Sequence, residues 1–226
     1  MLLYTMTETE IKKEIFNDSL EILTAIRGFT KSFVKSCKHR LPKMFPLLKF
    51  YTYKTTRGND IMILLDSPDY KSRNNPIFGV YFFTKTPTGS LRVYQPASFG
   101  KINSKIIVFT SHFISRYNNR MGLMYSNVYD ILKHYITNTT CSLGEINDNG
   151  TFYGTIKSGM IFGTVTNEVY YHTTFVNNDM LFNNQLEYVT EVKKLGAYFD
   201  DIRDAVEAHY KTTIIPEEIS QILQPK

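Results

Sequence analysis

Between Lys49 and Gln95 the chain consists of short runs rich in β-branched and aromatic residues, separated by residues that favour turns. The separators are the turn around Gly58, a polar loop at 72–76 and the segment Pro87–Gly89. This spacing and turn chemistry are typical of an antiparallel meander. The expected strands are Phe50–Thr55, Ile61–Asp66, Ile77–Thr84 and Leu91–Tyr94.

An amphipathic helix is expected before this meander, from Thr7 to Arg27. Thr7 and Glu10 have the spacing of a capping box, and isoleucines recur near one face of the helix. Gly28 is a possible interruption, after which the helix can resume to about Cys37.

The order of elements after residue 100 favours an α+β fold over a doubly wound sheet. A strand at Lys105–Phe109 leads into a helix that ends near Gly122, and a second helix follows, capped by Ser126. Three strands and a last helix complete a β-α-α-β-β-β-α unit. We therefore expect an antiparallel sheet with packed helices, divided into a basic helix-and-meander region (1–100), this unit (101–196) and an acidic helical tail (197–226). The three strands are Thr151–Lys157, Met160–Val165 and Val169–Val176, and the helix opens at Asn178 or Asp179.

Charge is distributed unevenly along the chain. The net charge is +5, but residues 22–129 hold 17 Lys and Arg against three acidic residues, whereas residues 130–226 hold seven against 13. Such asymmetry favours a polyanionic partner for the basic part. The simpler interpretation is that the lysines only solvate a surface.

Several classes of protein are disfavoured by what the sequence lacks. The start of the chain does not resemble a signal peptide, and no apolar run is long enough for a membrane span, so we expect a cytoplasmic protein without a membrane role. Cys37 and Cys141 are isolated and favour reduced thiols. The five histidines are scattered and there is no glycine-rich phosphate loop, so neither a metal nor a cofactor is expected.

The helix from Thr110 to Met121 carries the side chains that most clearly suggest a chemical function. His112, Arg116 and Arg120 follow one another at intervals of four residues and form one stripe. Apolar residues occupy the neighbouring arc, so the stripe should lie at the border between core and solvent. A solvated or salt-bridged helix face is the alternative for this pattern.

These residue types fit a phosphodiester. Guanidinium groups bind phosphate in a bidentate manner, and imidazole exchanges protons near neutral pH. Metal-free cleavage of RNA needs a base for the 2′-hydroxyl and cationic donors for the phosphate. His112 is thus a candidate acid or base, and Arg116 and Arg120 are candidate clamps.

The strand 168–176 is the expected partner of this helix. By alternation, Tyr171 and Thr173 should share one face, and His172 and Thr174 the other. Thr173 and Thr174 are candidate phosphate donors, whereas Tyr171, His172 and the helical Tyr117 are candidate supporting groups. The cations expected to hold the rest of a nucleic acid are Lys35, Lys38, Arg40, Lys43, Lys71, Arg73 and Lys105.

The run FTSHFISRYNNRMG, followed by a helix, a glycine-bearing hairpin and a strand ending in TTF, resembles the small BrnT-like and related RelE-superfamily ribonuclease domains. The resemblance covers about residues 105–177, and residues 1–100 have no counterpart. It implies a toxin-type, metal-independent endoribonuclease in which His112, Arg116 and Arg120 match the family's helix, and Thr173 or Thr174 matches more loosely. It also implies an acidic protein inhibitor as a possible partner.

Two other functions remain open on the sequence alone. The same basic surface suits a module that binds nucleic acid, RNA above all, without cleaving it. It also suits docking of an acidic protein partner, and the chain's own acidic tail around Asp200 and Asp204 is a candidate cover for the site.

Overall fold

The computed structural model describes residues 1–139, 143–182 and 190. Residues 1–180 form one compact unit, and 181–226 are grouped as a second. The expected tail and most of the helix expected from Asn178 lie outside the described residues. Within them, Asn178–Met180 is a short 3-10 turn.

The first unit is an α+β structure built on one sheet, as the order of elements predicted. Among the described residues the sheet has nine strands in the order β1-β2-β3-β4-β5-β9-β8-β7-β6. All neighbours are antiparallel except β5 and β9, which are parallel. The strands are β1 Leu47–Lys54, β2 Asp60–Ser67, β3 Ile77–Lys85, β4 Leu91–Pro96, β5 Ile106–Phe109, β6 Leu143–Ile146, β7 Thr151–Ile156, β8 Gly159–Thr166 and β9 Val169–Asn177.

The meander is confirmed as β1–β4, and its last strand pairs directly with β5. The division expected near residue 100 therefore separates two parts of one sheet. β6 was not expected; it adds a strand outside β7.

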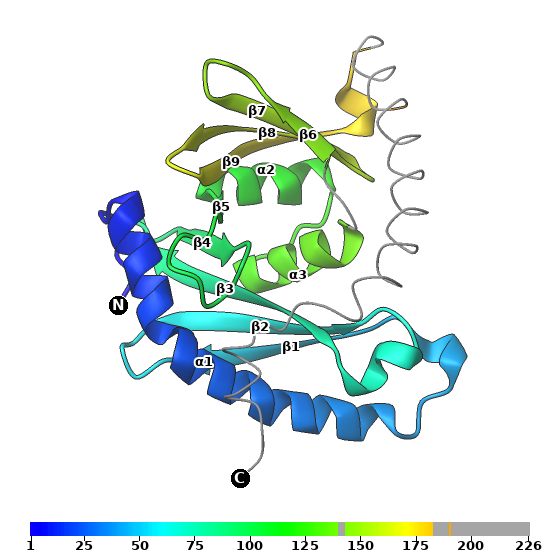
Figure 1. Ribbon diagram of the computed structural model, residues 1–226. Coiled ribbons are helices and arrows are strands. Elements are labelled where there is room, and N and C mark those ends of the chain that lie inside the picture. Colours follow the sequence, from blue (N-terminus) through cyan, green and yellow to red (C-terminus); the bar gives the residue numbers. More distant parts are fainter. Residues whose placement is uncertain (140–142, 183–189, 191–226) are drawn as a thin grey trace. The chain divides into compact units, whose positions relative to one another are not determined.

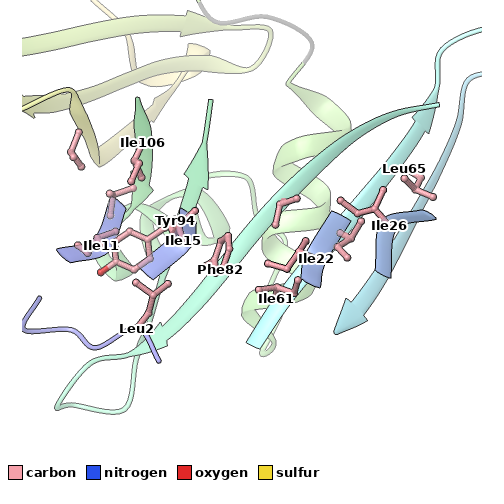
Figure 2. Packing of buried hydrophobic residues seen from close by; sticks show 14 of the residues in the cluster. Leu2, Ile11, Ile15, Ile22, Ile26, Ile61, Leu65, Phe82, Tyr94 and Ile106 are labelled. Atoms are coloured by element: carbon pink, nitrogen blue, oxygen red, sulfur yellow. The ribbon is translucent and has the colours of Figure 1, made fainter. Parts of the chain in front are cut away.

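Helix α1, Glu8–Cys37, covers one face of the sheet (Figure 1). The capping box of Thr7 and Glu10 is present, and Gly28 does not interrupt the helix, which runs on through 30 residues. Its apolar stripe packs on β2, β3, β4 and β5, as Figure 2 shows for part of this cluster. This packing offsets the roughly 1 kcal/mol that a glycine costs inside a helix.

Acidic residues on α1 are also buried, which the apolar pattern did not indicate. Glu14 and Asp18 are 6% and 1% exposed. They meet Arg57 and Asn59 from the turn between β1 and β2: Asn59 Nδ2 donates to Asp18 at 2.6 Å and to Glu14 at 3.2 Å, and Arg57 Nε lies 3.2 Å from Asp18. A buried charge needs such partners.

Helices α2, Ser111–Arg120, and α3, Val128–Asn138, pack on the opposite face. The cap of α3 is Asn127, whose side chain accepts from Tyr129 N, rather than the expected Ser126. The second core lies between these helices and β2, β3, β7, β8 and β9.

Candidate nucleic-acid interface

Helix α2 is fixed at its start and along one face. Thr110 caps it, accepting from Phe113 N at 3.1 Å, and also donates to the carbonyl of His172 on β9 at 2.8 Å. Phe113, Ile114 and Tyr117 are buried. The helix therefore has one defined orientation on the sheet, and the remaining arc faces outward.

The predicted stripe lies along that outward arc. His112 is exposed, and Arg116 and Arg120 are partly exposed. Within the described part of the chain, no carboxylate pairs with either arginine, and no hydrogen bond is made by the side chain of His112 or Arg116. The stripe is thus a cationic flank of α2 rather than a set of internal salt bridges.

Arg120 has a structural contact that Arg116 lacks. Its Nη1 donates to the backbone carbonyl of Phe175, and its own carbonyl accepts from Asn177 Nδ2 at 3.1 Å. β5 ends at Phe109, so among the described residues this part of β9 has no strand neighbour on that side, and Arg120 supplies a hydrogen-bond donor there. Burial, and secondarily the charge of Arg116 one helical turn away, lower the pKa of Arg120.

The expected alternation along β9 is wrong beyond His172. A bulge lies between Phe162 and Gly163 in the pairing of β8 with β9, so that Gly163 pairs with His172 but Phe162 pairs with Thr174. As a result His172 and Phe175 both face α2, with ring distances of 5.5 Å to Phe113 and 4.9 Å to Tyr117 respectively. Thr174 therefore does not share the face of His172.

The hydroxyls of Thr173 and Thr174 are not hydrogen-bonded to the stripe within the described residues. The hydroxyl of Thr173 donates to the carbonyl of Phe162 at 3.1 Å. The hydroxyl of Thr174 is buried and has no hydrogen-bond partner among the described residues. Among the described residues, neither hydroxyl makes a hydrogen bond with His112 or Arg116. The structure brings three of the five predicted catalytic residues together, on α2.

The predicted supporting residues make contacts in other parts of the structure. The hydroxyl of Tyr117 is 3.0 Å from His134 Nδ1, and burial raises the pKa of Tyr117 to about 12. Tyr171 donates to Glu8 of α1 at 2.9 Å; burial, followed by this bond, raises its pKa to about 12. Burial lowers the pKa of His172 to about 4. The hydroxyls of Tyr117 and Tyr171 thus stabilise the fold, and the backbone carbonyl of His172 helps to orient α2 because it accepts from Thr110.

The predicted nucleic-acid cations fall into two places. Most lie at the C-terminal end of α1 and in two short 3-10 turns beyond it, η1 (Pro42–Met44) and η2 (Lys71–Asn74). We call this group the α1-end surface; it comprises Lys35, Lys38, Arg40, Lys43, Lys71 and Arg73.

In the α1-end surface four lysines are exposed, and Arg73 lies over the ring of Tyr70, 4.0 Å from its centroid. η2 packs against α1, which brings both turns beside the helix end. α1 and α2 cover opposite faces of the sheet (Figure 1). This surface and the α2 flank are therefore two separate cationic areas. Lys105 belongs to neither; it lies just before β5.

Asn177 and the carbonyl of Phe175 were not anticipated as neighbours of the stripe. Only the bulge in β9 brings them to Arg120, and a bulge leaves no clear mark in this sequence.

In the described ranges no cluster of three or more His, Cys, Asp or Glu is arranged to hold a metal ion. None of the helices described there has both the length and the apolar character needed to cross a bilayer.

Comparisons of the chain with protein-family models, with curated proteins and with solved structures found no match.

Proposed function

We propose that this protein binds the phosphodiester backbone of a nucleic acid, RNA in the first place, through the flank of α2 that carries His112, Arg116 and Arg120. The observation that carries the proposal is the state of Arg116 and His112. Both lie on a rigid helix, both reach solvent, and within the described residues neither is paired with a carboxylate.

Electrostatics support this use of the flank. An unpaired guanidinium is a strong bidentate donor to phosphate, and cation contacts to phosphates supply most sequence-independent affinity for nucleic acids. Arg120, held against β9, keeps one end of the stripe in place, so that little side-chain entropy is lost there on binding. The start of α2 beside His112 adds the partial positive charge of a helix N-terminus.

The experiment is a titration of a fluorescent single-stranded RNA by the full chain, followed by anisotropy at several salt concentrations. The double variant His112→Ala with Arg116→Met should weaken binding about tenfold or more at low salt. Lys54→Gln is the matched control: Lys54 is exposed, pairs with Asp60 at 3.7 Å and belongs to β1 and not to the α2 flank, and its loss also removes one charge. Equal affinity of the double variant and the parent would refute the role of this flank. A DNA strand of the same sequence shows whether sugar type matters.

Metal-independent ribonuclease activity is a second candidate, favoured by one observation. His112 is one helical turn from Arg116, and its imidazole has no hydrogen bond within the described residues, so it is available for proton transfer. In such a reaction His112 would take the proton of a 2′-hydroxyl. The 2′-oxygen would form a bond to phosphorus, and the bond between phosphorus and the 5′-oxygen would break as that oxygen takes a proton from water. The products are a 2′,3′-cyclic phosphate and a free 5′-hydroxyl.

This activity is tested by incubating RNA with the protein in the presence of a chelator and analysing the ends of any fragments. Cleavage that disappears in His112→Ala, with RNA binding largely retained, would support it. Absence of cleavage, or cleavage that is unchanged in that variant, would leave binding as the function. An acidic inhibitor protein, as implied by the resemblance, would be recognised by competition with RNA for the same flank.

A further inference from the structure

A cavity of about 360 Å³ opens on the face of the sheet that carries α2, between the start of β5 and the strands β7–β9. Its walls are apolar and partly aromatic: Ile107, Phe152, Ile161 and Tyr170 line it. The rings of Phe152 and Tyr170 meet edge to face at 5.9 Å. This volume lies within the usual range for small-molecule sites, about 300–1,000 Å³.

One buried polar side chain lines this cavity. His172 is only 7% exposed, and its imidazole is enclosed by the rings of Phe109, Phe113 and Phe152 at 5.2, 5.5 and 5.3 Å. Its Nδ1 has no hydrogen-bond partner among the described residues. A polar group in such surroundings is costly unless something satisfies it, and unsatisfied buried groups of this kind often mark a ligand site.

The rim of the cavity carries a positive charge. Lys105 is exposed, and of the described residues that line the cavity it is the one with a charged side chain. Its ammonium group makes no ion pair within the described part of the chain. An anionic group attached to a ligand in the cavity would therefore meet a free cation at the mouth.

The cavity is tied to the α2 flank through the backbone. Thr110, which caps α2, bonds the carbonyl of His172 with both its N–H, at 3.2 Å, and its hydroxyl, at 2.8 Å. His112 follows two residues later. The wall of the cavity and the start of the cationic stripe are therefore parts of one rigid junction.

We infer that this cavity is a nucleotide subsite. The base of the nucleotide lies between the aromatic and aliphatic walls beside His172, and the phosphate of the same nucleotide contacts Lys105. The inference rests on the proposed function, because it makes the occupant a base of the bound strand turned out of its stack. Planar bases stack on aromatic side chains and make hydrogen bonds through their edges, which is how proteins recognise single-stranded RNA. A neutral imidazole offers one acceptor and one donor to such an edge.

The experiment uses the full chain and two kinds of probe. The first is the four nucleoside 5′-monophosphates, titrated by calorimetry, with the corresponding nucleosides as probes that lack the phosphate. The second is a short single-stranded RNA, intact or with one abasic position, titrated by anisotropy. The monophosphates report the cavity alone, and the abasic comparison reports a base within a strand.

The variants are His172→Phe, Lys105→Gln and, as matched control, Lys101→Gln. Lys101 is exposed, lies in the same loop before β5 and does not line the cavity. His172→Phe should weaken monophosphate binding about tenfold, the loss of one hydrogen bond to a buried group. Lys105→Gln should weaken it about fivefold for the monophosphates and leave nucleosides unaffected. Lys101→Gln should match the parent. Should His172→Phe fail to fold, the shift of the His172 ring signals in NMR spectra of the parent on adding a monophosphate takes its place.

The outcomes separate the two proposals. Monophosphate binding that is lost in both cavity variants, together with weaker binding of the abasic strand, supports the subsite. Salt-dependent RNA binding without any monophosphate binding or abasic effect overturns the subsite and leaves the proposed function intact. Monophosphate binding without RNA binding supports the cavity as a site for free nucleotides and overturns the function of the α2 flank. Binding of neither kind of probe overturns both.

Discussion

The guanidinium of Arg120 donates to the backbone carbonyl of Phe175, beyond the part of β9 that pairs with β5. This bond separates the roles of two arginines that look equivalent in the sequence. Arg120 completes the edge of a strand, whereas Arg116, one turn earlier, has no such contact among the described residues.

The first prediction follows from that separation. Arg120→Met should lower the free energy of unfolding by about 1–3 kcal/mol, because the carbonyl of Phe175 is left without its donor. Arg116→Met should change it by less than about 0.5 kcal/mol, as is usual for a surface residue. Urea unfolding of both variants checks this. A larger loss for Arg116→Met than for Arg120→Met would contradict it.

The salt dependence of RNA binding gives a second prediction. Removing one phosphate contact should reduce the slope of the logarithm of affinity against the logarithm of salt concentration by about one. Arg116→Met should show this reduction, since its guanidinium is free to bind phosphate. Lys54→Gln should keep the slope of the parent protein. Anisotropy titrations at four or more salt concentrations measure both slopes, and an unchanged slope for Arg116→Met would exclude its contact with phosphate.

A third prediction concerns pH. Burial lowers the pKa of His172 to about 4, below its ordinary value of 6.5, so the unfolded chain binds the proton more tightly than the folded protein. The contribution of His172 to the free energy of unfolding should therefore be fully present above pH 6.5. It should be lost as pH decreases toward 4, by up to about 3 kcal/mol.

His172→Phe should remove this part of the pH dependence. Burial also lowers the pKa of His134, so the difference between the parent and His172→Phe is the quantity to measure. Glu14 acts in a lower range. Burial opposes its ionisation, but hydrogen bonds from Arg57, the terminal amine and Asn59 lower its pKa to about 2, so its contribution is lost only below about pH 4.5. Chemical unfolding at pH 7, 6 and 5 tests the effect. Parallel curves for the two proteins would contradict the assignment to His172.

The buried cluster under α1 supplies a fourth prediction. Asn59→Ala should cost about 2–3 kcal/mol, because Glu14 and Asp18 each lose a hydrogen bond in a buried site. Asn59→Asp should cost more at pH 7, since it places a third carboxylate beside these two. The pKa of that new carboxyl group would be raised, so the excess cost over Asn59→Ala should shrink as pH falls from 7 to 5. Urea unfolding of both variants at these two pH values shows whether it does.

The local pattern of the chain was sufficient for most elements. The capping box at Thr7, the turn at Gly58 and the alternation of the meander each act over a few residues, and the structure has the helix and strands that they predict. The apolar arc beside the stripe in the same way predicted which face of α2 is buried. β6 was missed because it is short and carries no alternation strong enough to identify it.

The sequence by itself determined most elements of the α+β fold, the burial of one face of α2 and the placement of His112, Arg116 and Arg120 along the other, because helical and strand periods are properties of neighbouring residues. Only the tertiary structure decided the rest: that β5 lies parallel to β9, that a bulge turns His172 and Phe175 to the same face, and that His172 lines a cavity beside Lys105. The pairing of β5 with β9 and the cavity depend on contacts between residues more than 50 positions apart, which no local pattern encodes. The bulge lies between two strands adjacent in the chain, but the sequence carries no clear mark of it. The physical reason is packing: which strand pairs with which, and which side chain satisfies a carbonyl beyond the end of a neighbouring strand, depends on distant parts of the chain, as the bond from Arg120 to the carbonyl of Phe175 illustrates.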